Sequence, residues 1–176
     1  MTDKELVEGC IREDRKYQKI LWNLYSSKLM SLCLRYCKNQ EEAEDALMES
    51  FVRIYDKMPT FRYQSSLETW MRRISVNVSI NKLRAQKDIW KEISESEYEI
   101  GYTDTAFLQL EAKQILQLIE KLPVGYRTVF NLFVVEGYSH KEIAEMMAID
   151  EGTSRSQLAK ARKSLIEMLE NLNISR

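Results

Sequence analysis

LPVGYRTVFNLFVVEGYSHKEIAEMMAIDEGTSRSQLAKARKSLIEML is the sequence of residues 122–169, and its apolar spacing predicts three short helices. Pro123 suits the opening of the first helix, and Gly137 suits its end, because glycine readily adopts the left-handed conformation found there. Ser139 and Glu142 have capping-box spacing, which predicts that the second helix starts at Ser139. After a short turn, Asp150 can cap the third helix, so that the last two helices form a helix-turn-helix.

The side chains that we expect the third helix to leave outward are cations and short polar groups, with no acid from Thr153 to Lys163. Cations neutralise phosphates, while arginine, glutamine, serine and threonine near a helix N-terminus can reach base edges in the major groove. A solvated basic face on an ordinary helical hairpin is the alternative. The outward residues are Thr153, Ser154, Arg155, Ser156, Gln157, Lys160, Arg162 and Lys163.

The amino-acid composition indicates the fold class. Two prolines and five glycines in 176 residues favour helix throughout, and the length fits one large or two small domains. The apolar runs are too short for a membrane span, and the first residues lack the apolar core of a signal peptide. Three cysteines give no disulfide framework, and a single histidine, His140, leaves no metal-ligand set. We therefore expect a reduced, cytoplasmic protein without metal or cofactor.

The near-neutral net charge of −1 conceals an uneven distribution. Residues 62–87 hold six cations and one acid, Glu68, whereas residues 88–113 hold seven acids and two cations. An acidic stretch therefore separates two basic surfaces, which is the pattern expected of a protein with two nucleic-acid contacts.

Residues 40–58 form an amphipathic helix whose outer face is acidic at its N-terminal end, where the helix dipole favours anions. This face can dock a basic partner, or it can simply be solvated. Pro59 ends the helix, and Ser66 or Ser65 caps the next one. The acids of the outer face are Glu41, Glu42, Asp45 and Glu49.

The loop of residues 60–66 carries Phe61, Arg62 and Tyr63, and the helix after it presents arginine and asparagine opposite an apolar stripe. Bases can stack on aromatic or guanidinium planes while cations hold the backbone, so this pairing suits single-stranded nucleic acid. The alternative places Phe61 and Tyr63 in the core. For Trp70 we expect the core. The polar side of the helix holds Arg72, Arg73, Asn77, Asn81, Lys82 and Arg84.

AEDALMESFVRIYDKMPTFRYQSSLETWMRRISVNVSINKLRAQK (residues 43–87) resembles the second conserved region of bacterial sigma factors, and residues 122–165 resemble the fourth. With only these two regions and a short link, the chain is similar to the extracytoplasmic-function group. The segments EGYSHKEIA and GTSRSQL resemble members from Bacteroidetes-like bacteria. The resemblance implies an all-α fold of two small helical domains, residues 1–87 and 106–176, joined by the acidic linker 88–105.

The resemblance also implies roles for the first domain. Asp45 and Glu49 would bind core RNA polymerase, although Met48 stands where relatives often have glutamine. The loop would capture a base flipped from the −10 element, at a cost of a few kcal/mol in lost pairing and stacking. The residues implied for the −10 element are Phe61, Arg62, Tyr63, Arg73 and Asn77, with Arg72, Lys82 and Arg84 nearer to phosphates.

In the second domain, the resemblance places Arg155, Ser156 and Lys160 on the −35 duplex, helped by Thr153, Gln157 and Lys163. Relatives often have a bulkier side chain at the position of Ala159, so apolar contact with a base is expected to be reduced there. The implied partners are core RNA polymerase, through its largest and second-largest subunits, promoter DNA and an anti-sigma factor. We expect no small-molecule substrate and no catalysis, because no nucleophile, metal or phosphate-loop constellation is present.

Two rival functions remain. A stand-alone helix-turn-helix regulator explains residues 122–169 but not the aromatic, basic first domain. A helical adaptor without DNA binding would use the amphipathic helices alone.

Overall fold

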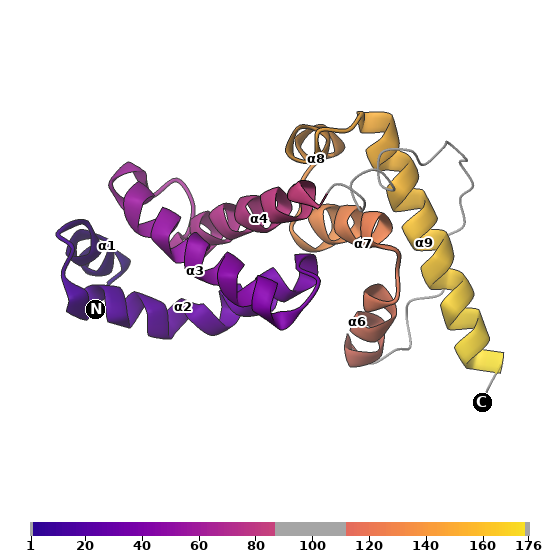
Figure 1. The fold of residues 1–176 in the computed structure, drawn as a ribbon, viewed down its shortest axis with the longest axis horizontal. Coiled ribbons are helices and arrows are strands. Elements are labelled where there is room, and N and C mark those ends of the chain that lie inside the picture. The colour runs from indigo at the N-terminus through magenta and orange to yellow at the C-terminus, as the bar shows by residue number, and fades with distance from the viewer. Residues whose placement is uncertain (1, 87–111, 175–176) are drawn as a thin grey trace. The chain divides into compact units, whose positions relative to one another are not determined.

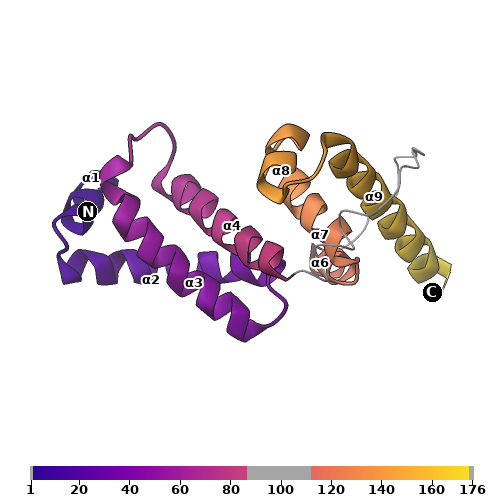
Figure 2. The same cartoon turned by 45° about the horizontal axis from the view of Figure 1, so that its top comes forward.

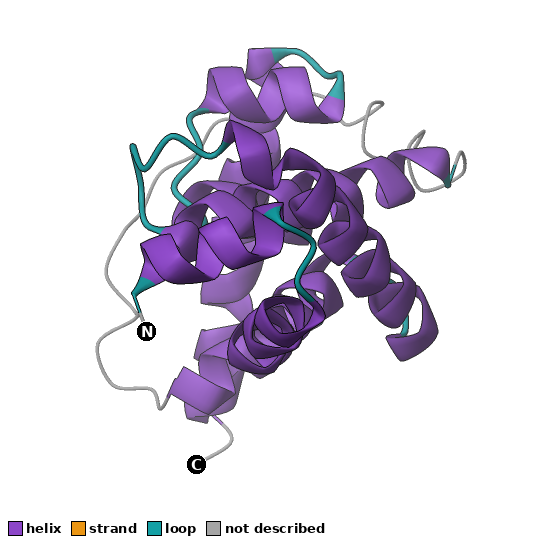
Figure 3. Ribbon diagram, turned by 90° about the vertical axis from the view of Figure 1, so that its left-hand side faces the viewer, coloured by secondary structure: helices purple, strands orange, loops and turns teal. Residues whose placement is uncertain are grey.

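A computed structural model describes residues 2–86 and 112–174, and every regular element within these ranges is helical (Figures 1 and 3). The chain divides into two compact units, Met1–Ala85 and Gln86–Arg176. The all-α prediction is confirmed for the described residues. The predicted linker, residues 88–105, lies outside them, as does the predicted start of the second domain at residue 106.

Unit 1 is a bundle of α2 (Arg15–Tyr36), α3 (Gln40–Lys57) and α4 (Leu67–Ala85), which pack against one another pairwise (Figures 1 and 2). The short helix α1 (Asp3–Ile11) packs against α2 and against the 3₁₀ turn η1 (Met58–Thr60). Since η1 leads directly into the loop of residues 61–66, α1 supports that loop through its contact with η1. The largest fully buried side chains of the bundle are Leu6, Leu21, Leu29, Leu32, Ile54, Met58, Leu67, Met71 and Ile80.

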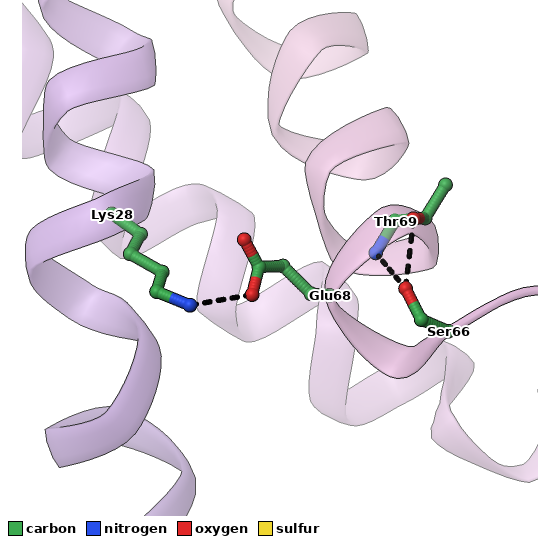
Figure 4. Close-up of polar contacts among 4 residues, drawn as sticks. All are labelled: Lys28, Ser66, Glu68 and Thr69. Carbon is green, nitrogen blue, oxygen red and sulfur yellow. Dashed lines mark hydrogen bonds and ion pairs between the residues drawn. The ribbon is translucent and has the colours of Figure 1, made fainter.

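Local side-chain caps set the helix starts in unit 1. Asp14 and Asn39 accept hydrogen bonds from the first-turn amides of α2 and α3, as expected of residues with short polar side chains. The Ser66 Oγ accepts from the Thr69 amide of α4 at 3.1 Å (Figure 4), which settles the choice between Ser66 and Ser65. Helix α1 is capped by Thr2, whose hydroxyl forms a capping box with Glu5.

Unit 2 contains α6 (Ala112–Glu120), α7 (Val124–Phe130), the π-helical turn η2 (Asn131–Val135), α8 (His140–Met147) and α9 (Glu151–Ile174). Helix α9 packs against α7 and α8, so the last two helices form the predicted helix-turn-helix (Figure 1). Their shared core holds Val129, Leu132, Ile143, Met147, Leu158, Ala161, Leu165 and Leu169. At this turn Leu169 fills the core and Met168 is only half-buried.

The turns of unit 2 follow the predicted chemistry. Ser139 and Glu142 form the capping box of α8. Gly137 has φ +78° and Ala148 has φ +49°, so both lie in the left-handed region that ends a helix. The π-helical turn was not predicted. There the Glu136 amide bonds to the Asn131 carbonyl at 2.9 Å, a pattern that shifts the side chains of one turn around the helix axis.

Candidate nucleic-acid and polymerase interface

The outer face of α3 is acidic at its start and apolar further along. Asp45 is exposed and Glu49 is half-buried. Met48 and Val52 follow on the same face and are 56% and 57% exposed, although both are large apolar residues. The face therefore offers carboxylates beside apolar contact area, which suits a partner that is both basic and apolar.

Glu49 is held in place by two cations. Its Oε1 accepts a hydrogen bond from the Arg53 guanidinium at 2.6 Å, and its Oε2 lies 3.7 Å from the Lys82 Nζ. Arg53 is on the same helix, whereas Lys82 is on α4. One carboxylate therefore joins the acidic face of α3 to the basic face of α4.

The loop of residues 61–66 separates its two aromatic rings into different environments. Phe61 is only 8% exposed and packs between Tyr63 and Trp70, with ring centroids 4.7 and 5.2 Å away. Tyr63 is 51% exposed and has φ +57°. The left-handed conformation is unfavourable for tyrosine, and such strain gathers at functional sites. Phe61 is thus a supporting residue, and Tyr63 is the ring presented to solvent.

Helix α4 shows its polar residues on one side and its core residues on the other. Arg73, Asn77 and Arg84 are exposed, as is Arg62 in the preceding loop. Arg72 and Lys82 are half-buried. The spacing of four and seven residues between Arg73, Asn77 and Arg84 places them on one helix face.

Lys28 of α2 contacts the first turn of α4 and was not identified from the sequence. Its Nζ donates to the Glu68 Oε2 at 2.6 Å, across from the Ser66 cap (Figure 4), and lies 5.6 Å from the Tyr25 ring centre. The hydrogen bond to Glu68 raises the pKa of Lys28. Glu68 is the one acid among residues 62–87, so Lys28 neutralises a charge that would repel phosphate. In the sequence, the isolated acid Glu68 within a basic segment was the signal that could have indicated a cationic partner.

Arg155 is exposed on α9, where its guanidinium donates to the Glu151 Oε2 at 2.6 Å. Lys163 is exposed and Lys160 is half-buried. Arg155 and Lys163 therefore lie on the surface of the helix, as the sequence predicted, whereas Lys160 is partly covered.

The short polar residues of α9 do not lie outward, contrary to prediction. Thr153, Ser154, Ser156 and Gln157 are 8%, 0%, 1% and 1% exposed. Ser154 turns inward because its hydroxyl bonds to His140, and Ser156 turns back to the Thr153 carbonyl at 3.4 Å.

Two family models match the chain: Sigma-70 region 2 over residues 21–89 and Sigma-70 region 4 over residues 112–165. The chain is also 34% identical to an ECF RNA polymerase sigma-E factor of Haemophilus influenzae, over 97% of this chain and 95% of that protein. The chain belongs to the ECF sigma factors. This sigma factor binds core RNA polymerase and directs promoter-specific transcription initiation.

Further comparisons agree. The sigma factor is 31% identical to the ECF RNA polymerase sigma factor SigW of Bacillus subtilis, over 98% of this chain and 99% of that protein. Two solved structures share its fold. CnrH, solved with the cytosolic domain of CnrY, aligns with TM-score 0.53 at 16% identity over 96% of this chain and 97% of the other. RpoE of Bartonella quintana, solved with the anti-sigma factor NepR, gives 0.52 at 19% identity over 86% and 96%.

His140 is a second residue of this sigma factor that the sequence did not mark as functional. It opens α8, its Nδ1 lies 2.9 Å from the Ser154 Oγ, and its ring stacks on Phe133 with centroids 4.5 Å apart. Burial lowers the pKa of His140, and the neighbouring Arg155 lowers it further. Its only sequence signal was that it is the single histidine of the chain.

Within residues 2–86 and 112–174, no group of three or more His, Cys, Asp or Glu could hold a metal ion, and no helix is long and apolar enough to cross a membrane. The three cysteines, Cys10, Cys33 and Cys37, are buried and unpaired. Burial raises the pKa of Cys10 and of Cys37 to about 11, so these thiols are protonated at neutral pH.

Proposed function

We propose that unit 1 of this sigma factor docks on core polymerase through α3 and holds the separated −10 strand on α4, while unit 2 binds the −35 duplex through α9. The observations that carry this division are the exposed Tyr63 ring in the loop before α4 and the polar face of α4 that holds Arg73, Asn77 and Arg84. A single strand requires an exposed ring together with cations and an amide, since bases stack while phosphates are neutralised.

Asp45 and Glu49 are the proposed polymerase contacts. Met48 replaces the glutamine frequent in relatives, so this position contributes apolar contact in place of a hydrogen bond. With Val52 it extends the interface beyond the carboxylates. The partner surface that fits is a basic helix with apolar residues between its cations, on the largest subunit, with the second-largest subunit contacting other parts of the chain.

Tyr63 is the proposed stacking ring for the base that leaves the −10 duplex, and Phe61 holds the loop in shape. Arg62, Arg73 and Asn77 would contact the strand, and phosphates would lie near Arg72, Lys82 and Arg84. Lys82 also pairs with Glu49, so the DNA surface and the polymerase surface of unit 1 share one ion pair.

On α9, Arg155 is the proposed base contact, and Lys160 and Lys163 neutralise phosphates. Arg155 must leave Glu151 to reach DNA; an exposed pair of this kind is worth about 0–1 kcal/mol, so the exchange costs little. Contacts by Thr153, Ser156 and Gln157 further require that their face of α9 be uncovered.

We also propose that an anti-sigma factor binds this chain, because two proteins with its fold were solved with partner proteins: CnrH with the cytosolic domain of CnrY, and RpoE with the anti-sigma factor NepR. The proposed domains are residues 1–87 and 106–176, joined by the linker 88–105. We propose that the protein acts in the cytoplasm without catalysis of its own. The segments EGYSHKEIA and GTSRSQL support a Bacteroidetes-type subgroup.

Transcription in vitro tests the proposal. Purified protein, core polymerase and a fragment library of the host genome should give initiation at a small set of fragments that share two spaced elements. Arg155→Ala should weaken recognition of the upstream element by about 1–3 kcal/mol without changing assembly with polymerase. Duplex binding without polymerase association would instead support the regulator, and absence of both activities would support the adaptor.

A further inference from the structure

Three elements of unit 2 meet at one imidazole. His140 belongs to α8, its ring stacks on Phe133 of η2 at an interplanar angle of 24°, and its Nδ1 is hydrogen-bonded to Ser154 of α9. Ser154 is fully buried, and the hydroxyl therefore has no access to solvent. The contact links the first residue of α8 to the first turn of α9, the two helices of the helix-turn-helix.

The position of Ser154 determines where its neighbour points. Successive residues of an α-helix are rotated by about 100° around the axis, so a serine fixed inward directs Arg155 outward. A rotation of α9 about its axis would move the Arg155 guanidinium across the helix surface and away from any one base edge. Holding Ser154 therefore fixes the rotational setting of the residue proposed to read the −35 element.

The π-helical turn provides the second contact of the His140 ring, on the side of Phe133. It is closed by the bond from the Glu136 amide to the Asn131 carbonyl, and a second bond of 2.9 Å runs from the Tyr138 amide to the Leu132 carbonyl. Phe133 lies within this turn. The turn places the Phe133 ring against the imidazole at a centroid distance of 4.5 Å.

We propose that His140 is a positioning residue for −35 recognition: by binding Ser154 and stacking on Phe133, it sets the rotation of α9 and thereby the base discrimination of Arg155. This inference rests on the proposed function of α9.

The charges around the imidazole make this setting sensitive to pH. Arg155, Arg162 and Glu151 face it from α9, and Lys141 and Glu142 adjoin it on α8, while η2 contains no ionisable residue. Two of the three groups on α9 are cations, so a protonated imidazole is repelled from the helix that it holds. Acidification should weaken the positioning of α9.

The test compares base discrimination in the full holoenzyme. The affinity for a promoter fragment selected by the wild-type protein is divided by that for the same fragment with its upstream element scrambled. His140→Phe retains a ring against Phe133 but leaves Ser154 without its partner, and it should lower this ratio about fivefold, as loss of one hydrogen bond would. Ser154→Ala should do the same, and the double variant should lose no more.

Lys141→Ala is the matched control, because it removes an exposed charge from the next residue and should leave the ratio unchanged. The wild-type ratio should also fall as the pH drops below about 6.5, because the pKa of His140 is lowered in the folded state, while that of His140→Phe stays flat. Ser154→Ala keeps the test decisive if replacing the imidazole prevents folding.

An unchanged ratio in a folded His140→Phe or Ser154→Ala holoenzyme would overturn the inference, even if thermal stability fell, since the contact would then be structural only. A wild-type holoenzyme that selects no promoter would overturn the proposed function itself, and the inference with it. The two failures are therefore distinguishable.

Discussion

Tyr63 and Phe61 lie two residues apart in one loop, yet Tyr63 is exposed and Phe61 is buried. Tyr63→Ala should weaken binding of the −10 strand by about 1–3 kcal/mol, the value of one stacked base, and should leave stability unchanged. Phe61→Ala should instead destabilise unit 1 by about 3–5 kcal/mol, because it removes a buried ring. Fluorescence titration of the holoenzyme with a labelled single strand, together with thermal unfolding, measures both. Equal effects of the two variants on stability would contradict this assignment.

Gly9 shows how one missing side chain permits a helix contact. A Cβ at Gly9 would overlap the Tyr17 ring, so Gly9→Ala must displace α1 from α2 and should cost about 1–3 kcal/mol. Because α1 also supports η1, we expect weaker −10 strand binding too. Thermal unfolding of unit 1 checks the first effect, and Tyr17→Ala in the same chain should restore part of the loss. An unchanged unfolding temperature in Gly9→Ala would contradict the close packing.

At the scale of the helix, unit 2 should lose stability as the pH falls below about 6.5, the usual pKa of histidine. Burial lowers the pKa of His140 in the folded state, so the unfolded chain binds the proton first. The stabilisation by the neutral imidazole is therefore complete above that pH and is lost as the pH falls toward the lowered pKa of the folded state. Denaturant unfolding across this range measures the loss, and His140→Phe should abolish it. If the free energy of unfolding of His140→Phe still fell with pH over this range, the effect would come from other groups and the assignment to His140 would be wrong.

Helix starts, caps and core stripes could be predicted from the sequence because they depend on residues a few positions apart, as at Ser66 and Ser139. The contacts that depend on distant residues could not. The Lys28–Glu68 pair joins residues 40 positions apart, and the His140–Ser154 bond joins residues 14 apart. The polarity of Gln157 suggested an outward position, but this residue is 1% exposed.

For the molecule as a whole, charge is arranged so that surfaces for different partners stay distinct within a nearly neutral chain. In unit 1 the acidic face of α3 and the basic face of α4 belong to one bundle, and the Glu49–Lys82 contact is where they meet. A partner that attracts the Glu49 carboxylate would release Lys82 toward phosphate. The Glu49 carboxylate would repel the phosphates of the strand, and the Lys82 ammonium would repel a basic partner. Because polymerase would engage Glu49 and the strand would engage Lys82, the two binding events are electrostatically compatible.

The polymerase surface yields a prediction with a matched control on the same helix. Asp45→Arg places a cation where a basic partner surface is proposed, and like charges at an interface cost several kcal/mol, so holoenzyme affinity should fall about a hundredfold or more. Combined with Glu49→Arg, it should abolish assembly. Glu44→Arg makes the same charge change at an exposed neighbour. Its side chain is rotated by about 100° around the helix axis from that of Asp45, so this variant should have little effect. Co-elution with core polymerase measures all three, and helical content by circular dichroism controls for folding. If Asp45→Arg assembled as well as Glu44→Arg, the docking surface would have to lie elsewhere on unit 1, and the exposed Met48 and Val52 would no longer have an assigned partner.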